Sequence, residues 1–247
     1  MRKNFLLTSM LFCFLNNLSF SQPAPADSTA SNPALQNTID FYYAVTGENA
    51  HLYSGSEYAR TTNNNTVIGH PYLGTTAMQN GSIWYSGILY KNIPLLYDIV
   101  NDEIVINKYN QTYLMNLPEE KISFFSMLTD TFIRIVPDSA GKALPGIGFY
   151  NRIYNAKMQV LVKRKKVLTE DPPAYGVSQF HYLQRNSYFV KKQKIYFQVS
   201  SRKSLFKLFD DKSKEIRRYL RKNKIDFKEQ PENAIVQAAQ YYDLLTN

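Results

Sequence analysis

The sequence has a single cysteine, Cys13, and only one tryptophan and three histidines among its 247 residues. A disulfide scaffold needs several cysteines, so this class of secreted protein is excluded. Thiolate metal sites and thiol redox centres are excluded for the same reason. His51, His70 and His181 are too far apart in sequence for a two-histidine metal motif. The chain is 44% hydrophobic and 20% charged, which is the composition of a folded globular protein.

The first 21 residues have the three zones of a secretory signal peptide. Two basic residues precede an apolar run from Phe5 to Phe20, and the small residue Ser21 precedes Gln22. We expect residues 1–21 to be removed after Ser21. The run is interrupted by asparagines and is shorter than the roughly 20 apolar residues of a membrane span. The protein is therefore expected to be exported to the periplasm or the extracellular space, in a soluble or peripheral form.

Residues 22–32 have the composition of a spacer. The segment consists of Pro, Ala, Ser and polar residues with almost no apolar bulk. It cannot bury enough surface to offset its ordering entropy, so we expect a disordered linker. Residues 33–247 are then predicted to form a single globular domain. It opens with a helix, because Pro33 suits a first helical position and Leu35 and Ile39 recur at helical spacing.

The region from about residue 80 to 200 is rich in β-branched and aromatic residues with a period near two. Three hairpins are predicted around polar turns at 101–103, 155–157 and 191–193, and Asn80-Gly81 is a further turn signal. Turns of two or three residues can join only strands that are antiparallel neighbours. The sequence therefore predicts an antiparallel meander that forms a roll, an open barrel or a sandwich. No helical pattern separates the strands, which disfavours a parallel α/β sheet.

Residues 203–246 return to helical spacing. Ser204 is the expected cap of a short helix, Asp211 is the expected cap of a longer one, and Pro231 opens a final helix. The predicted fold class is therefore α+β, mainly β, with one N-terminal helix and two or three C-terminal helices packed on the sheet.

The strongest feature outside the core is the positive charge of this C-terminal region. The chain carries 29 Lys and Arg against 20 Asp and Glu, a formal charge of +9. The candidate residues for binding an anionic surface are Lys214, Arg217, Arg218, Arg221, Lys222 and Lys224. Each cation near an anionic surface contributes about 1 kcal/mol, which suits lipid, glycan or nucleic acid. Nucleic acid is the weaker candidate for an exported chain, and a solvated helix face is the alternative interpretation.

Catalytic signatures are weak. The sequence has no GxSxG nucleophile elbow. Asp98, Asp102 and Glu103 are candidates for paired carboxylates, although polar residues are also what a turn needs. His70 is the remaining candidate for a general base. An envelope hydrolase that uses carboxylates or His70 therefore stays open as one alternative. A carrier with an empty apolar cavity inside the β roll is another.

Five local patterns occur together along the chain. They are Leu52-Tyr53-Ser54-Gly55-Ser56-Glu57-Tyr58, Gly69-His70-Pro71-Tyr72, Gly81-Ser82-Ile83-Trp84-Tyr85-Ser86-Gly87, Pro94-Leu95-Leu96-Tyr97-Asp98 and Lys203-Ser204-Leu205-Phe206-Lys207-Leu208-Phe209. In this combination the sequence resembles a family of exported bacterial envelope proteins with no assigned function. The resemblance implies one exported domain and carries over no catalytic residues.

The absence of a reactive motif and the basic C-terminal region together favour a non-enzymatic envelope protein. Its expected role is that of a binding or interaction module. The expected partner is another envelope protein, an anionic lipid surface or a glycan, and neither a cofactor nor a metal is expected.

Overall fold

The computed structural model describes residues 33–46, 51–59, 67–108, 113–136, 146–172 and 178–246. The predicted signal peptide and linker lie outside the described residues, so both stay predictions. The chain divides into two compact units, Met1–Phe41 and Tyr42–Asn247. The first helix, α1 (Pro33–Thr46), begins at the predicted proline, whose fixed φ suits a first helical position.

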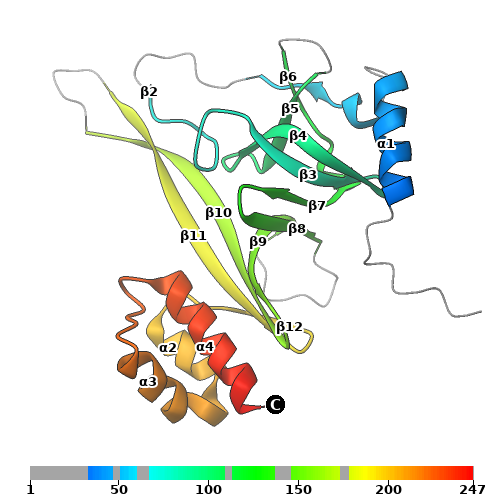
Figure 1. Ribbon diagram of the computed structural model, residues 1–247. Coiled ribbons are helices and arrows are strands. Elements are labelled where there is room, and N and C mark those ends of the chain that lie inside the picture. Colours follow the sequence, from blue (N-terminus) through cyan, green and yellow to red (C-terminus); the bar gives the residue numbers. More distant parts are fainter. Residues whose placement is uncertain are drawn as a thin grey trace, which may run out of the picture. The chain divides into compact units, whose positions relative to one another are not determined.

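The second unit contains one sheet of twelve strands (Figure 1). The strands are β1 (Ser56–Glu57), β2 (Val67–Ile68), β3 (Gln79–Tyr85), β4 (Ile88–Asp98), β5 (Glu103–Asn107), β6 (Leu114–Asn116), β7 (Ile122–Met127), β8 (Asp130–Ile135), β9 (Gly148–Asn155), β10 (Met158–Glu170), β11 (Phe180–Lys192) and β12 (Ile195–Gln198). They follow the order β1-β6-β5-β4-β3-β7-β8-β9-β10-β11-β12, and β2 pairs with β11. Among the described residues β1 and β12 do not pair with each other, so the sheet is open.

The prediction of a mainly β, antiparallel fold is confirmed. Every pair of neighbouring strands is antiparallel except β2 and β11. The three predicted hairpins are present as β4–β5, β9–β10 and β11–β12. The sheet departs from a simple meander at β3, which lies between β4 and β7. The longest pair is β10–β11, with 13 residues in register on each strand.

The predicted turn at Asn80-Gly81 is wrong, because both residues lie inside β3. A Cβ added at Gly81 would lie 2.2 Å from the backbone oxygen of Ser126 on β7. Glycine is required there for the close approach of a neighbouring strand. The turn follows instead at Ser86-Gly87, where both φ angles are positive, 49° and 83°. Two such residues between strands form a tight hairpin turn whose twist matches the sheet.

Three C-terminal helices follow the sheet: α2 (Arg202–Leu208), α3 (Ser213–Lys222) and α4 (Pro231–Leu245). Short 3₁₀ turns cover His51–Tyr53, Glu119–Lys121 and Asp210–Lys212. Pro231 opens α4 as predicted. The predicted cap of α2 is wrong by three residues, because Ser201 is the cap and Ser204 is the third helical residue. The two serines bond each other's backbone N–H in a capping box, so Ser204 closes the same cap from the other side.

The predicted cap of α3 is also wrong. Asp211 lies in the 3₁₀ turn before the helix, and Lys212 occupies the cap position without a side-chain bond. The Asp211 carboxylate instead accepts a hydrogen bond from the Tyr242 hydroxyl of α4 (3.0 Å). A long-range partner therefore takes the side chain that the local sequence assigns to capping.

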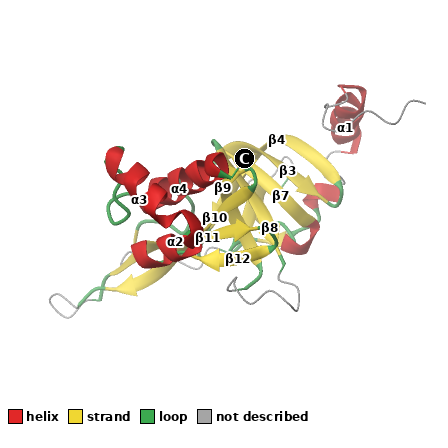
Figure 2. Cartoon of the chain, turned by 90° about the horizontal axis from the view of Figure 1, so that it is seen from below, coloured by secondary structure: helices red, strands yellow, loops and turns green. Residues whose placement is uncertain are grey.

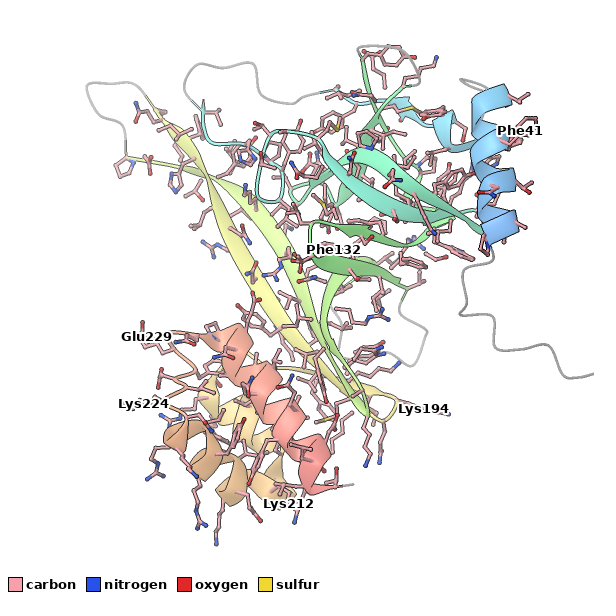
Figure 3. The ribbon with its side chains drawn as sticks, viewed as in Figure 1. Phe41, Phe132, Lys194, Lys212, Lys224 and Glu229 are labelled. Atoms are coloured by element: carbon pink, nitrogen blue, oxygen red, sulfur yellow. The ribbon has the colours of Figure 1, made fainter. Side chains whose placement is uncertain are left out.

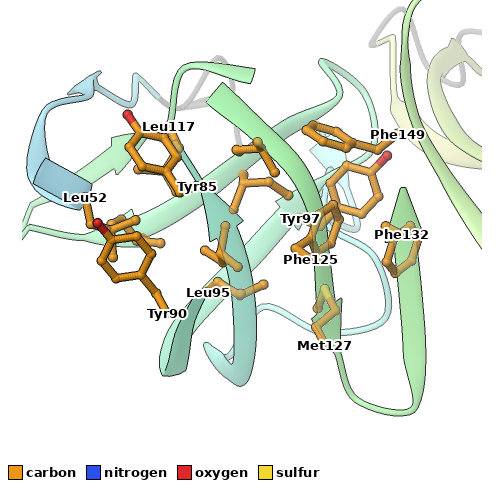
Figure 4. Packing of buried hydrophobic residues seen from close by; sticks show 14 of the residues in the cluster. Leu52, Tyr85, Tyr90, Leu95, Tyr97, Leu117, Phe125, Met127, Phe132 and Phe149 are labelled. Carbon is orange, nitrogen blue, oxygen red and sulfur yellow. The ribbon is translucent and has the colours of Figure 1, made fainter. Parts of the chain in front are cut away.

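Aromatic rings fill one face of the sheet around β4, β7 and β8 (Figure 4). The rings of Phe125 and Phe132 stack with centroids 4.7 Å apart, and Tyr97 meets both edge-on at 5.1 Å. All three side chains are fully buried. Burying a ring of this size contributes about 1.5–3 kcal/mol. The apolar-carrier hypothesis needs a cavity, whereas side chains occupy this face.

A second cluster joins the helices to β9, β10, β11 and Val199, which follows β12. Figures 1 and 2 show the helices beside this end of the sheet. Its buried members from strands include Met158 and Val190, and those from helices include Phe209, Ile216 and Ile235. Polar bonds fix α4 against the same strands. Arg164 of β10 holds Glu232 of α4 through two N–O contacts of 2.5 and 3.1 Å, and Tyr154 donates to Asp243 at 2.8 Å. The helices are thereby fixed against the end of the sheet where β9 turns into β10.

Candidate functional site

The structure divides the six candidate cations of the C-terminal region into two stripes. All six are exposed. Residues four apart lie along one row of a helix surface, so Arg217 and Arg221 form one stripe, which Lys224 continues just beyond the helix end. Lys214, Arg218 and Lys222 form the second stripe. In Figure 3, Lys212 and Lys224 mark the two ends of this basic region.

The first stripe lines a pocket of ≈ 250 Å³, and the second does not. The lining residues are Arg202, Leu205, Phe206, Arg217, Leu220, Arg221, Lys224, Ile225, Asp226 and Phe227. We call this the cationic pocket. It has four cationic side chains against one carboxylate, around apolar residues that belong to the buried cluster of the helices. Such a mixture binds an anionic group and leaves room for an apolar neighbour.

Two arginines flank the ring of Phe206 in this pocket. The guanidinium carbon of Arg217 lies 4.4 Å from the ring centroid, and that of Arg202 lies 5.8 Å away. Phe206 is itself 5% exposed, so its ring is held by the core. A guanidinium over an aromatic face is attracted by the ring quadrupole and loses less freedom when it binds an anion. The ring therefore positions two donors toward the same pocket.

Lys224 reaches the pocket through an unusual backbone conformation. It follows α3 with a φ of 55°, and its N–H donates to the Arg221 carbonyl oxygen (3.1 Å). Helices commonly end this way with glycine, because a side chain at positive φ costs about 1 kcal/mol or more. A lysine at this position puts an ammonium group at the pocket at the expense of stability.

The cations of the pocket form no salt bridge with the residues that the structure describes. Among the described residues, none of the salt bridges involves Arg202, Arg217, Arg221 or Lys224. Their side chains also make no hydrogen bond within the described part of the chain. Four cationic groups beside a single carboxylate, Asp226, leave a net positive charge in the pocket, and a bound anion relieves their mutual repulsion.

A second pocket of ≈ 600 Å³ adjoins the first. Its lining residues are Asn186, Ser187, Tyr188, Gln198, Val199, Ser200, Arg202, Asp226, Phe227, Lys228 and Pro231. We call this the polar pocket. Arg202, Asp226 and Phe227 line both pockets, so the two share a wall.

The sequence-predicted carboxylate Asp98 is buried in a structural role. It is 1% exposed, and its oxygens accept bonds from the Tyr58 hydroxyl (2.7 Å), the Val100 N–H (2.8 Å) and Asn101. Desolvation and the bond to Asp98 raise the pKa of Tyr58 far above its usual value. The oxygens of Asp98 are thus engaged in holding the β4–β5 turn, which is the pattern of a turn carboxylate rather than of a poised acid.

His70 lies beside the same turn. Lys166 of β10 donates to the backbone oxygens of His70 (2.9 Å) and Tyr72 (2.7 Å). Burial and the nearby Lys166 charge lower the pKa of His70, and burial lowers the pKa of Lys166 against an opposing effect of Asp98. His70 and Asp98 therefore both lie near Lys166, whereas the hydrolase alternative also needs them to meet in a cleft. Neither residue lines the cationic or the polar pocket.

Asp102 closes the turn from the other side. It accepts bonds from the Tyr97 hydroxyl (2.5 Å), the Phe149 N–H (3.1 Å) and the Lys163 ammonium (2.5 Å). A Cβ added at Gly148 would lie 1.9 Å from its carboxylate. Glu103 begins β5, and burial raises its pKa. Asp98 and Asp102 therefore serve the β4–β5 hairpin, and Asp102 also its contact with β9 and β10. Glu103 instead accepts a bond from the Asn116 side chain of β6 (3.4 Å).

Sequence reasoning located the basic stripe but missed its partners. Arg202, Phe206 and Phe227 come from segments on either side of α3, and only the packed helices bring them to Arg217. No signal in the sequence links these positions. No group of three or more potential metal ligands is present in the described part of the chain. Within that part, every helix is too short or too polar to cross a membrane.

Comparison of the chain with protein-family models, with curated proteins and with solved structures found no match. The chemistry of the site therefore rests on its own residues.

Proposed function

We propose that this protein is an exported, non-enzymatic envelope module that binds an anionic group in the cationic pocket. The proposal includes removal of the signal peptide after Ser21 and location outside the cytoplasm. The observation that carries the binding role is the convergence of four cationic side chains from α2, α3 and the segment after α3, none of which forms a salt bridge with a described residue. The ring of Phe206 holds two of these side chains, Arg202 and Arg217, in position.

The arrangement favours recognition of a discrete anion over diffuse attraction. Arginine presents paired N–H groups that match two oxygens of a phosphate or carboxylate, so two arginines one helical turn apart form a fixed set of donors. Diffuse attraction to a charged surface would use both stripes of the basic region equally. The pocket contains only one of them.

The two stripes supply a matched experiment. Titration with inorganic phosphate at low ionic strength, followed by calorimetry or amide chemical shifts, is compared between two triple variants. The pocket variant is Arg217→Gln, Arg221→Gln and Lys224→Gln. The control variant is Lys214→Gln, Arg218→Gln and Lys222→Gln, which removes the same charge from the same region.

The pocket variant is expected to lose phosphate binding by about tenfold or more, equivalent to about 1.4 kcal/mol, while the control loses much less. Equal losses in the two variants would show diffuse electrostatics and overturn the pocket. Absence of phosphate binding by the unmodified protein at millimolar phosphate would overturn the proposal as a whole. Thermal unfolding of each variant confirms that the helices remain folded.

A further inference from the structure

The polar pocket differs from its neighbour in having neutral polar side chains beside its charged ones, Arg202, Asp226 and Lys228. Four of its side chains are neutral amides and hydroxyls: Asn186, Ser187, Gln198 and Ser200. Ser187 and Gln198 make no side-chain hydrogen bond to any described residue. Hydroxyl and amide groups both donate and accept, so a ligand covered with hydroxyl groups satisfies them in either direction. A purely apolar ligand would leave them without a partner, at a cost of about 1–3 kcal/mol for each buried group.

The same pocket presents two aromatic side chains, Tyr188 and Phe227, each half-buried. Aromatic faces pack against apolar C–H surfaces, which a sugar ring presents on its faces while its hydroxyls point outward from the edge. The pocket volume of ≈ 600 Å³ lies within the range of about 300–1,000 Å³ that ligand sites occupy. Size, hydrogen-bonding groups and aromatic faces thus suit the same class of ligand.

We propose that the two pockets together bind a saccharide that carries an anionic group. The sugar ring occupies the polar pocket, and its phosphate or carboxylate occupies the cationic pocket. This inference rests on the proposed function, because it names the ligand class of the same site.

The shared wall explains how one ligand spans both pockets. Arg202 and Asp226 line each of them. One oxygen of Asp226 accepts the Lys228 N–H (2.7 Å), and the other has no hydrogen-bond partner among the described residues. A carboxylate accepts bonds from sugar hydroxyls and repels a phosphate. Asp226 therefore favours a ligand whose hydroxyl-bearing part, and not its anionic part, lies at the junction.

Glucose 6-phosphate, inorganic phosphate and glucose separate the contributions of the two pockets. The unmodified protein is expected to bind glucose 6-phosphate about tenfold more tightly than inorganic phosphate, a gain of about 1.4 kcal/mol from the sugar ring. Free glucose is expected to bind most weakly, because it leaves the cationic pocket empty. Equal affinity for glucose 6-phosphate and phosphate would overturn the saccharide assignment while leaving the proposed anion binding in place.

The double variant Ser187→Ala and Gln198→Ala tests the polar pocket. It is expected to lose most of the advantage of glucose 6-phosphate over phosphate while its phosphate affinity stays unchanged. Phosphate affinity is thus an internal control for folding. An unchanged preference for glucose 6-phosphate in this variant would contradict the assignment.

For the variant Asp226→Asn we expect the affinity for phosphate and the preference for glucose 6-phosphate to change in opposite directions. This variant keeps the oxygen that caps Lys228 and removes a negative charge beside the cationic pocket. Phosphate affinity is expected to rise, and the relative advantage of glucose 6-phosphate is expected to fall. Adenosine 5′-monophosphate serves as the competing ligand class. If adenosine 5′-monophosphate binds more tightly than glucose 6-phosphate, the assignment of a saccharide ligand is overturned in favour of a nucleotide.

Discussion

The guanidinium of Arg217 lies 4.4 Å from the ring centroid of Phe206, although the two are eleven positions apart in sequence and belong to different helices. The contact couples the buried cluster of the helices to the wall of the cationic pocket. The core therefore determines the position of a binding side chain.

Replacing Phe206 by Leu is expected to lower phosphate affinity by about two- to fivefold, since a cation–π contact contributes about 0.5–1 kcal/mol. The free energy of unfolding should fall by about 1 kcal/mol. Phe209→Leu is the matched control, because Phe209 is fully buried and does not line the pocket. It should lose comparable stability and retain phosphate affinity. Equal affinities for the two variants in calorimetric titration would show that the ring has no role in binding.

Lys224→Gly is expected to raise the free energy of unfolding by about 1 kcal/mol, because glycine adopts positive φ without strain. The same change removes an ammonium from the pocket and should lower phosphate affinity. Lys224→Gln separates the two effects, since it removes the charge and keeps the strained side chain. Both variants should bind phosphate equally weakly, but only the glycine variant should gain stability in urea denaturation. A lower free energy of unfolding for Lys224→Gly would show that the positive φ of Lys224 does not strain the backbone.

Asp102→Asn should lower the free energy of unfolding by about 2–4 kcal/mol, because it leaves the part-buried Lys163 without its counterion. Asparagine tolerates the φ of 68° at this position, so the backbone is preserved. The double variant with Lys163→Met should recover part of the loss, which a double-mutant cycle measures. Additive losses would mean that the two residues do not interact energetically.

The lowered pKa of His70 predicts that the free energy of unfolding depends on pH. Its pKa in the folded protein is lowered below 6.5 by burial and by Lys166, so the fold favours the neutral imidazole. Below pH 6.5 the unfolded chain takes up a proton that the folded chain does not, and the free energy of unfolding falls. His70→Gln should show a smaller fall between pH 7.5 and 5.5. Other titratable groups are common to both proteins and cancel in this difference, so identical falls would refute the effect.

The hairpins could be predicted because their turns are local. The turn at 101–103 needs only polar residues next to one another, and the structure has β4 and β5 on either side of it. The prediction for Asn80-Gly81 was wrong because this dipeptide can either form a turn or, as here, lie inside a strand. Whether a glycine bends the chain or admits a neighbouring strand depends on Ser126, more than forty residues away.

The site was predicted only in part, for a related reason. The density of Lys and Arg along a single segment identified Arg217 and Arg221. The division into two stripes, and the contribution of Arg202 and Phe227, depend on how α2 and the segment after α3 pack. Asp211 shows the same limit, since its side chain binds Tyr242 of α4 rather than the nearby helix end.

The charges of α3 also act on the helix that carries them. Three pairs of cations lie four residues apart, Lys214 with Arg218, Arg218 with Lys222, and Arg217 with Arg221, and each such pair destabilises a helix by about 0.2–0.5 kcal/mol. Dissolved salt screens this repulsion but also weakens attraction for a ligand. Ionic strength therefore has opposite effects on the empty and the occupied protein. A bound anion replaces the salt, and its contribution to thermal stability is greatest in dilute buffer.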